Sequence, residues 1–336
     1  MQLNNITNRP YCQEPLDQLT GEILCDKTEK GKERPWREKK VRNMKLAEAY
    51  DLFDSSKAAR LRDCAKYLKF RRYLDGTMKL HHMNSCRVRL CPVCAWRRSL
   101  RTYYNNLKIV RFLKEKKDYQ YIFVTLTVRN CRAHELKKTI DDMQLAINRF
   151  NKRPEILAAF KGTCRCLEIT HNVDVNSPNF DTYHPHFHMI CAVNPTYFKS
   201  KAYLSQARLT ELWASCLAVN YTPVCNIKRC YGSLEKAVAE SSKYATKDVE
   251  YILPDKWDFT VQTVKTLDDV LRNRRLVNYT GIMREAKAIL KLEDEEKGNL
   301  IDVGEEMSDK DKDEAYTLVS YYFYNGYRQY ISIVNI

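Results

Sequence analysis

The sequence predicts an α+β protein with a small cysteine-rich segment ahead of its main sheet. Runs of β-branched and aromatic residues predict strands at 121–128, 164–170 and 183–193. Apolar residues spaced three or four apart predict an amphipathic helix at 134–150, and further helices follow the strands. A loop of turn-forming residues, 172–181, returns the third strand antiparallel to the second.

Composition narrows the classes of function. The 336 residues carry a net charge of +15, with 57 Lys or Arg, which indicates a polyanionic partner: nucleic acid first, an anionic membrane surface second. No apolar run reaches the roughly 18 residues of a spanning helix, and the N-terminus is polar, so we expect a soluble cytoplasmic protein without a membrane partner. Thirteen cysteines, an odd number, favour free thiols and a metal site over disulfides.

A cysteine knuckle predicts a structural zinc site. Cys86, Cys91 and Cys94 lie within nine residues, and the Cys-Pro-x-Cys turn aims two thiolates at one ion. Zinc takes four ligands, and Cys64, on a helix expected within 45–74, is the favoured fourth. The alternatives for that fourth ligand are His81 and His82. Asp54 or Ser55 is expected to cap a second helix in this segment.

Two arginine clusters are candidate DNA contacts. The first begins a helix directly after the knuckle, where rigid arginines suit phosphate contact, although a solvated helix face is an equal alternative for each one. The second precedes a helix through Ile282 and Ile289. The candidate residues are Arg97, Arg98, Arg101, Arg274 and Arg275.

The third strand carries a row of histidines. Alternation along a strand places His184, His186 and His188 on one face. Pro185 lacks an N–H, which predicts a strand start or an edge position. Because the preceding strand runs antiparallel, Glu168 can lie beside the histidines.

Two imidazoles and a carboxylate make a three-ligand site that leaves positions open for water and substrate. His186, His188 and Glu168 would suit Mg²⁺ or Mn²⁺, acting as a Lewis acid on a phosphoryl oxygen. His171 and His184 are rivals for the third position.

A helix expected at 233–247 carries a polar cluster. Glu240, Tyr244 and Lys247 share one face, and Lys243 lies close to it. A tyrosine at helical spacing is usually a packing residue. Beside two lysines and a glutamate, and following the histidine strand, Tyr244 becomes a candidate for chemistry.

These residues resemble the replication initiators of small rolling-circle plasmids, in the HUH endonuclease superfamily, and specifically the branch with a cysteine-rich segment ahead of the nuclease core. Three motifs occur in the family's order: 123–128 resembles motif one, 184–188 the HUH motif and 243–247 the tyrosine motif. The resemblance covers roughly 60–290.

The resemblance implies a central five-stranded antiparallel sheet flanked by helices. The HUH strand would lie mid-sheet beside the motif-one strand, and the tyrosine helix would cross the metal site. It also implies a reaction: Tyr244 attacks a scissile phosphate at the plasmid double-strand origin, giving a 5′-phosphotyrosine and a 3′-OH primer. Lys243 and Lys247 would stabilise the phenolate or the pentavalent phosphate. Glu240 would activate water for the final cleavage that terminates replication.

The resemblance implies partners as well: single-stranded or extruded origin DNA, the host helicase and replication machinery, and a possible homodimer. The expected divisions are a basic mobile arm at 1–44, a helical zinc-binding segment at 45–105, the nuclease core at 106–255, a basic helical extension at 256–292, an acidic linker at 293–314 and a terminal hairpin at 315–336.

Two other readings remain open. A zinc-containing DNA-binding transcriptional regulator without catalysis would use the knuckle and the basic arm alone. An HUH relaxase or transposase would keep the chemistry, but relaxases commonly place their tyrosine ahead of the histidines, whereas Tyr244 follows them.

Overall fold

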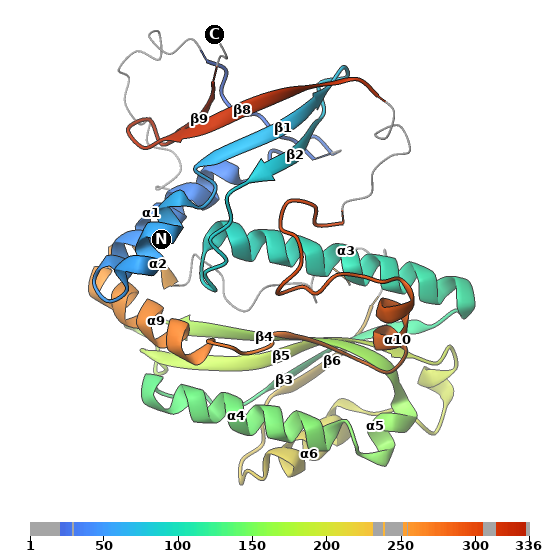
Figure 1. Cartoon of the computed structure of the whole chain (residues 1–336). Coiled ribbons are helices and arrows are strands. Elements are labelled where there is room, and N and C mark those ends of the chain that lie inside the picture. Colours follow the sequence, from blue (N-terminus) through green and yellow to red (C-terminus); the bar gives the residue numbers. More distant parts are fainter. Residues whose placement is uncertain are drawn as a thin grey trace. The chain divides into compact units, whose positions relative to one another are not determined.

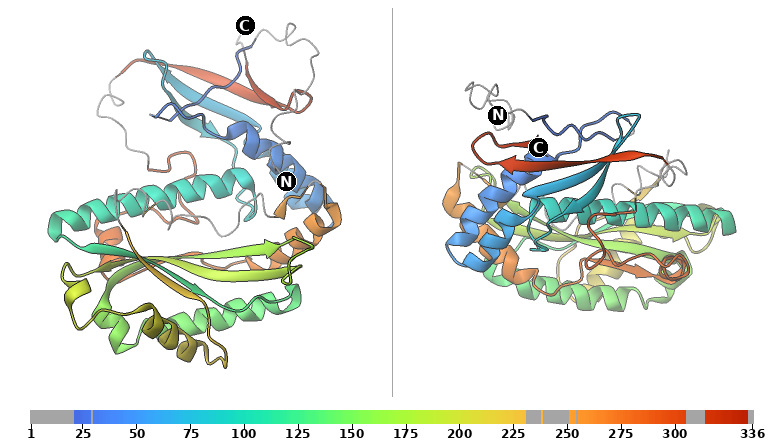
Figure 2. Two further views of the ribbon diagram at one scale, coloured as in Figure 1. Left: turned by 180° about the vertical axis from the view of Figure 1, so that it is seen from behind. Right: turned by 45° about the horizontal axis from the view of Figure 1, so that its top comes forward.

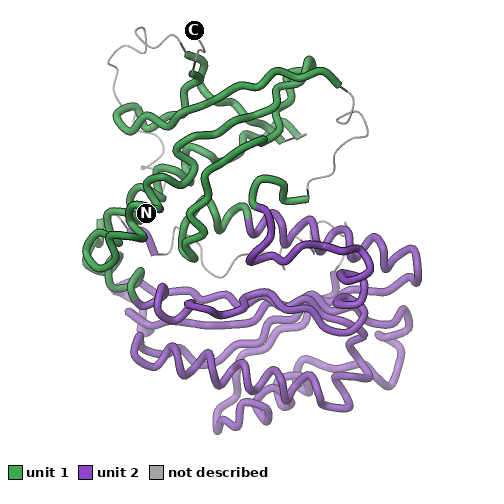
Figure 3. Tube along the Cα trace, in the orientation of Figure 1, with its two compact units in different colours: residues 1–97, 254–265, 300–336 green, residues 98–253, 266–299 purple. Residues whose placement is uncertain are grey.

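The structure is a computed structural model that describes residues 21–28, 30–230, 238, 251–253, 255–304 and 314–333. The chain forms two compact units (Figure 3). Unit 1 comprises 1–97, 254–265 and 300–336, and unit 2 comprises 98–253 and 266–299.

Unit 2 contains a five-stranded antiparallel sheet in the order β6-β3-β5-β4-β7. Its strands are β3 (Gln120–Thr127), β4 (Phe160–Asn172), β5 (Thr182–Val193), β6 (Cys225–Arg229) and β7 (Val277–Thr280). The predicted α+β class with a five-stranded antiparallel sheet is therefore confirmed, and the histidine strand β5 lies mid-sheet beside the motif-one strand β3.

Helices cover both faces of this sheet (Figures 1 and 2). One face carries α4 (Ala133–Phe150), α5 (Pro154–Ala159) and α6 (Gln206–Leu217), and a short 3-10 turn, η3 (Tyr197–Lys199), precedes α6. The other face carries the unit 2 part of α3 (Pro92–Lys116) together with α10 (Gly281–Ile289).

The two faces of β5 alternate as a buried strand requires. On the α3 and α10 side, Ile190 and Ala192 pack with Leu107 and Met283. On the opposite side, Phe187 meets Trp213 of α6 at 6.2 Å between ring centroids. The apolar stripe predicted for α4 is fully buried: Leu136, Ile140, Met143, Ile147 and Phe150.

Unit 1 contains a second antiparallel sheet in the order β2-β1-β8-β9. Its strands are β1 (Tyr67–Tyr73), β2 (Met78–Met83), β8 (Tyr316–Tyr324) and β9 (Gln329–Ser332). The helices α1 (Trp36–Asp51) and α2 (Ser55–Asp63) belong to this unit, and α9 (Trp257–Val270) begins in it. Asp54 caps α2 by accepting a hydrogen bond from the Lys57 backbone N–H.

The structure contradicts three of the sequence predictions. The apolar spacing after Cys64 belongs to β1 rather than to a helix, because Leu68 and Phe70 alternate with half-buried residues and face the core of unit 1. The basic arm is not mobile throughout, because α1 starts at Trp36 and buries it. The start of the acidic linker is packed rather than solvated: Glu295 is buried, and its carboxylate accepts hydrogen bonds from Lys287 and Asn105.

The position expected for Pro185, at a strand start or on an edge, is also wrong, since Pro185 is the fourth residue of β5 and β5 is the central strand. The pairing of β5 with β3 ends at His186, opposite Thr127. Pro185 lies one residue beyond that point, so its missing N–H costs no bond to β3.

Candidate active site

The register of the two longest strands builds a mixed histidine and carboxylate cluster. Glu168 on β4 lies directly opposite His186 on β5, so the two side chains share a face. His188 lies two residues along β5 and returns to the same face. This is the face that carries the α3 and α10 core, and the cluster lies beyond the end of that core.

The ligand atoms of the three residues converge. His188 Nε2 lies 3.0 Å from Glu168 Oε2, and His186 Nε2 lies 3.6 Å from the same oxygen. The two Nε2 atoms are 3.0 Å apart. All three side chains could bind one metal ion.

Each histidine is oriented through its other ring nitrogen. His186 Nδ1 lies 3.1 Å from the backbone carbonyl oxygen of His184, and His188 Nδ1 lies 3.3 Å from Thr125 Oγ1 on β3. Phe123 stacks on the His188 ring with centroids 5.3 Å apart. Such partners fix the tautomer and leave both Nε2 atoms available as ligands.

The cluster favours an ionised carboxylate. Burial alone would raise the pKa of Glu168, but hydrogen bonds and charge from His186 and His188 outweigh burial and lower that pKa. Glu168 is therefore ready to bind a cation over the whole neutral range.

The structure separates these residues from the two rival ligands. His171 Nε2 lies 3.0 Å from Asp181 Oδ1, and its ring stacks on Tyr183. His184 stacks on His186 but is not among the residues whose ligand atoms converge.

Two imidazole nitrogens and one carboxylate oxygen fit a divalent ion. This donor set suits ions with mixed N and O preference, and Mn²⁺ or Mg²⁺ is accommodated when substrate oxygens complete the shell. Three protein ligands leave room for those oxygens, which a closed four-ligand site does not.

Thr125→Val is expected to weaken Mn²⁺ binding about tenfold or more, because the hydroxyl that orients His188 is lost while the side-chain shape is kept. Calorimetric titration of the purified protein with Mn²⁺ measures the effect. Thr127→Val is the matched control on the same strand, because the Thr127 hydroxyl donates instead to the Val224 carbonyl oxygen. Equal Mn²⁺ affinity in both variants would show that Thr125 does not position the ligand.

A second candidate metal site consists of four buried cysteines. Cys64, at the end of α2, joins Cys86, Cys91 and Cys94, whereas the alternative fourth ligands, His81 and His82, are exposed. The Sγ atom of Cys64 lies 3.6 Å from the Sγ atoms of both Cys91 and Cys94. Tetrahedral zinc with Zn–S bonds of about 2.3 Å places its sulfurs about 3.8 Å apart, so the group fits Zn²⁺ and is far too open for a disulfide.

The backbone around the cysteines adopts conformations that direct the side chains and N–H groups toward one another. Ala65 and Arg87, each directly after a cysteine of the group, adopt left-handed φ values of 51° and 54°. Cys86 N–H and Cys94 N–H point at the sulfurs of Cys64 and Cys91, at 3.4 and 3.5 Å. These features aim the sulfurs at a common centre.

A buried cation accompanies the cysteine group. Lys40 of α1 is fully buried, and its ammonium donates to the carbonyl oxygens of Arg62 and Cys64 at 2.7 and 2.6 Å. Burial lowers the pKa of Lys40, and the neighbouring cysteine charges oppose that shift. The Lys40 ammonium would therefore offset part of the negative charge that the four cysteines carry when they bind an ion as thiolates.

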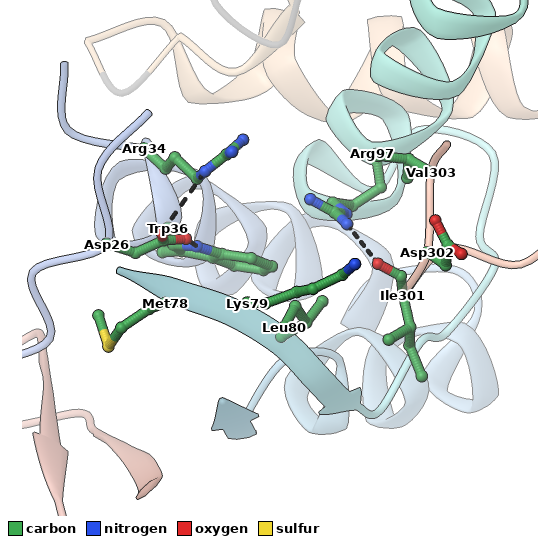
Figure 4. A pocket seen from close by; sticks show the side chains of 10 residues that line it. All are labelled: Asp26, Arg34, Trp36, Met78, Lys79, Leu80, Arg97, Ile301, Asp302 and Val303. Atoms are coloured by element: carbon green, nitrogen blue, oxygen red, sulfur yellow. Dashed lines mark hydrogen bonds and ion pairs between the residues drawn. The ribbon is translucent and has the colours of Figure 1, made fainter. Parts of the chain in front are cut away.

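The arginines that follow the cysteine knuckle lie inside the protein rather than on its surface. Arg97, Arg98 and Arg101 are all buried. Arg97 donates to the carbonyl oxygens of Leu300 and Ile301 at 2.8 and 2.6 Å, beside Trp36 in a small pocket of unit 1 (Figure 4).

Arg101 is held in the same way within unit 2. It donates to the Asn299 carbonyl oxygen and pairs with Glu293 at 3.0 Å. The expected phosphate contacts of Arg97, Arg98 and Arg101 are therefore incompatible with this fold: all three are buried, and Arg97 and Arg101 bond to the chain after α10.

The two arginines of the second cluster differ in their exposure. Arg274 is mostly buried and pairs with Asp141 of α4 at 2.6 Å. Arg275 remains exposed and pairs with Asp294 at 2.7 Å, so it stays accessible to a phosphate.

The tyrosine motif lies outside the described residues: Glu240, Tyr244, Lys243 and Lys247 all fall within 239–250. Val238, which is described, packs in the core between the sheet and α3, with Cys166 and Ile190. The chain six residues before Tyr244 thus lies on the sheet face that bears Glu168 and the histidines.

Comparison with known proteins places the chain in a family. The family model described as "Replication protein" matches residues 77–331. The chain belongs to the replication protein (Rep) family. A protein named "Protein rep" from Bacillus amyloliquefaciens is 37% identical over 92% of this chain and 97% of its own length. Proteins of the same name from Lactiplantibacillus plantarum and from Streptococcus pneumoniae serotype 2 (strain D39 / NCTC 7466) are 34% and 32% identical, over 88% and 85% of this chain and 94% and 90% of their own lengths.

No solved structure matches the fold significantly. Within the described part of the chain, none of the helices combines the length and the apolar character needed to cross a membrane.

Sequence reasoning missed the residues that support the two metal groups in this Rep protein. Thr125 and Phe123 flank His188 only because of the β3–β5 register, which no local pattern reveals. Lys40 and Asn43 lie in the segment read as the end of a mobile arm, yet both are fully buried beside the cysteines. The helical spacing of Trp36, Lys40 and Asn43 was the available signal.

Proposed function

We propose that this protein initiates rolling-circle replication of a plasmid by nicking one strand of the double-strand origin. The observation that carries this proposal is the convergence of Glu168, His186 and His188 on the central strands of the sheet, in a chain of the Rep family. An open three-ligand site of this kind suits phosphate chemistry on a polyanionic substrate, and the net charge of +15 suits that substrate.

The reaction is a transesterification by Tyr244. Its phenolic oxygen forms a bond to the scissile phosphorus, the bond from phosphorus to the 3′-oxygen breaks, and the leaving 3′-oxygen takes a proton to become the primer hydroxyl. The DNA is left as a 5′-phosphotyrosine, so the phosphoester is conserved for rejoining. A free phenol has a pKa of about 10, and Lys243 and Lys247 lower the cost of forming the phenolate.

The cluster on β4 and β5 would hold the divalent ion. When bound by Glu168, His186 and His188, Mn²⁺ or Mg²⁺ supplies Lewis-acid polarisation of a phosphoryl oxygen. Thr125 and the His184 carbonyl keep the two imidazoles in place, so the ligands need no reorganisation as substrate arrives. The cysteine group would hold Zn²⁺ as a structural ion.

Tyr244→Phe is expected to abolish a metal-dependent covalent protein–DNA adduct. Purified wild type and variant are incubated with labelled single-stranded oligonucleotides spanning the origin of the encoding replicon, with Mn²⁺ or Mg²⁺, and resolved on denaturing gels. Tyr203→Phe, at a half-exposed tyrosine of unit 2, is the matched control and should form the adduct normally.

The other outcomes are equally informative. An adduct that survives Tyr244→Phe assigns the nucleophile to another tyrosine. Tight duplex binding without any wild-type adduct contradicts the nickase and supports a DNA-binding regulator.

Glu240→Ala separates initiation from termination. Because Glu240 would activate water only for the last cleavage, the variant is expected to nick normally and to release unit-length circles poorly. Gel analysis of plasmid products in cells measures the ratio of circles to longer products. Unit-length circles at the wild-type level would remove Glu240 from the mechanism.

A further inference from the structure

One face of the unit 1 sheet carries tyrosines and cations that neither metal group uses. In the β1–β8 pairing, Tyr67 lies opposite Tyr322, and Tyr73 lies opposite Tyr316. Residues opposite one another in an antiparallel pair share a face. We call the set Tyr67, Lys69, Arg71, Tyr316, Tyr322 and Tyr324 the tyrosine face.

The reverse side of the same strands forms the core of unit 1. Leu68, Phe70, Tyr321 and Phe323 are buried there, and Phe70 meets the Trp36 ring edge-to-face at 5.9 Å. The tyrosine face, by contrast, is half-buried or exposed, with Tyr316 at 45% exposure and its neighbour Leu318 at 47%.

Cations and rings interleave on the tyrosine face. The Arg71 guanidinium lies 4.8 Å from the Tyr316 ring, and the Lys66 ammonium lies 5.2 Å from the Tyr322 ring. Tyr322 and Tyr324 are ring neighbours at 5.4 Å. The four strands β1, β2, β8 and β9 contain no aspartate or glutamate, so the surface is positive without internal neutralisation.

Two polar groups on this side have no hydrogen-bond partner among the described residues. Arg71 Nε and the Tyr73 hydroxyl are both buried and unsatisfied. Such groups are costly when they lack a partner. Both atoms lie out of a ligand's reach, so contact with a phosphate would fall to the accessible part of the half-buried Arg71 side chain.

We propose that the tyrosine face binds single-stranded DNA, with Tyr316, Tyr322 and Tyr324 stacking on unpaired bases and Lys69 and Arg71 contacting the phosphates. Exposed aromatic rings on a sheet, flanked by cations, bind single strands because every base presents a stacking surface once it is unpaired. The choice of DNA rests on the proposed function, in which one origin strand is exposed or displaced.

Fluorescence anisotropy with a labelled thymidine oligonucleotide tests the proposal on the full-length protein. Tyr316→Ala, and Tyr322→Leu, which keeps apolar bulk, are each expected to weaken binding about fivefold or more. Arg71→Gln is expected to weaken binding and to flatten its salt dependence. Tyr203→Ala, at a half-exposed tyrosine of unit 2, is the control and should bind as wild type does.

Adduct formation, measured at a saturating concentration of the origin oligonucleotide, separates a failure of the tyrosine-face proposal from a failure of the proposed nicking activity. The face variants should still form the Tyr244-dependent adduct. Unchanged binding with normal adduct formation would overturn the tyrosine face and leave the nickase standing. Weakened binding in the face variants, together with no adduct from the wild type, would support the tyrosine face and remove the nickase.

Two further results would overturn the choice of occupant. Tighter binding of a uridine oligoribonucleotide than of its thymidine counterpart would assign the face to RNA. A change of oligomeric state in the face variants, without any change in DNA binding, would make it a protein interface.

Discussion

His188→Ala is expected to lower the metal-dependent nicking rate by about a thousandfold or more. The substitution removes one of three candidate ligands and also the nearer of the two histidines to Glu168, whose Oε2 lies 3.0 Å from His188 Nε2. Lewis-acid stabilisation of the transition state is worth several kcal/mol, and each 1.4 kcal/mol lost is about a factor of ten in rate.

The same substitution changes the charge of the cluster. With one histidine gone, burial is less well opposed, so the pKa of Glu168 should rise and further weaken metal binding. Raising the Mn²⁺ concentration is therefore expected to restore part of the rate. Single-turnover nicking of an origin oligonucleotide, followed across a metal titration, measures both effects.

His134→Ala provides the matched control, because His134 is exposed on α4 away from the cluster. Circular dichroism and duplex-origin binding should be unchanged in both variants, which separates loss of chemistry from loss of fold. Wild-type nicking and metal dependence in His188→Ala would exclude this cluster as the catalytic metal site.

The core of the candidate site could be predicted because each step is local. Alternation along a strand places His186 and His188 on one face, and a short loop makes the preceding strand its antiparallel neighbour. The position of Glu168 on that neighbour then follows. The support from Thr125 could not be predicted, because it depends on the register of a strand that is not adjacent in sequence.

The N-terminal region could not be predicted for a similar reason. Leu61, Ala65 and Leu68 fit a helical period, but Cys64 ends α2, and Ala65 takes a left-handed φ that turns the chain into β1. β1 is a strand because β8, from the other end of the chain, pairs along its whole length. Tertiary pairing outweighs local propensity here.

The arginines after the knuckle show the limit of composition arguments. A basic helix start beside a zinc site is as compatible with anchoring the protein's own backbone as with contacting phosphates. Arg97 and Arg101 find carbonyl oxygens about 200 residues away in the chain. The chain after α10 that receives them is acidic, a composition typical of a solvated linker.

Cys64→Ser is expected to abolish zinc binding at the cysteine group and to destabilise unit 1 by several kcal/mol or more. Cys64 ends α2, Cys86 follows β2, and Cys91 and Cys94 flank the start of α3, so one ion bound by all four would join three segments. Without it, burial and the neighbouring thiols raise the pKa of Cys91, and the left-handed residues Ala65 and Arg87 lose the ligand geometry that holds them.

Zinc content by mass spectrometry and limited proteolysis measure the loss. Wild type should bind one zinc per chain, and Cys64→Ser should bind little and be cleaved first within unit 1. Cys25→Ser is the matched control, since Cys25 is exposed and outside the group. Zinc retained by Cys64→Ser but lost on adding His82→Ala would identify a histidine as the fourth ligand. A wild type that binds no zinc, together with unchanged thermal stability in Cys64→Ser, would mean that the four cysteines are ordinary buried thiols.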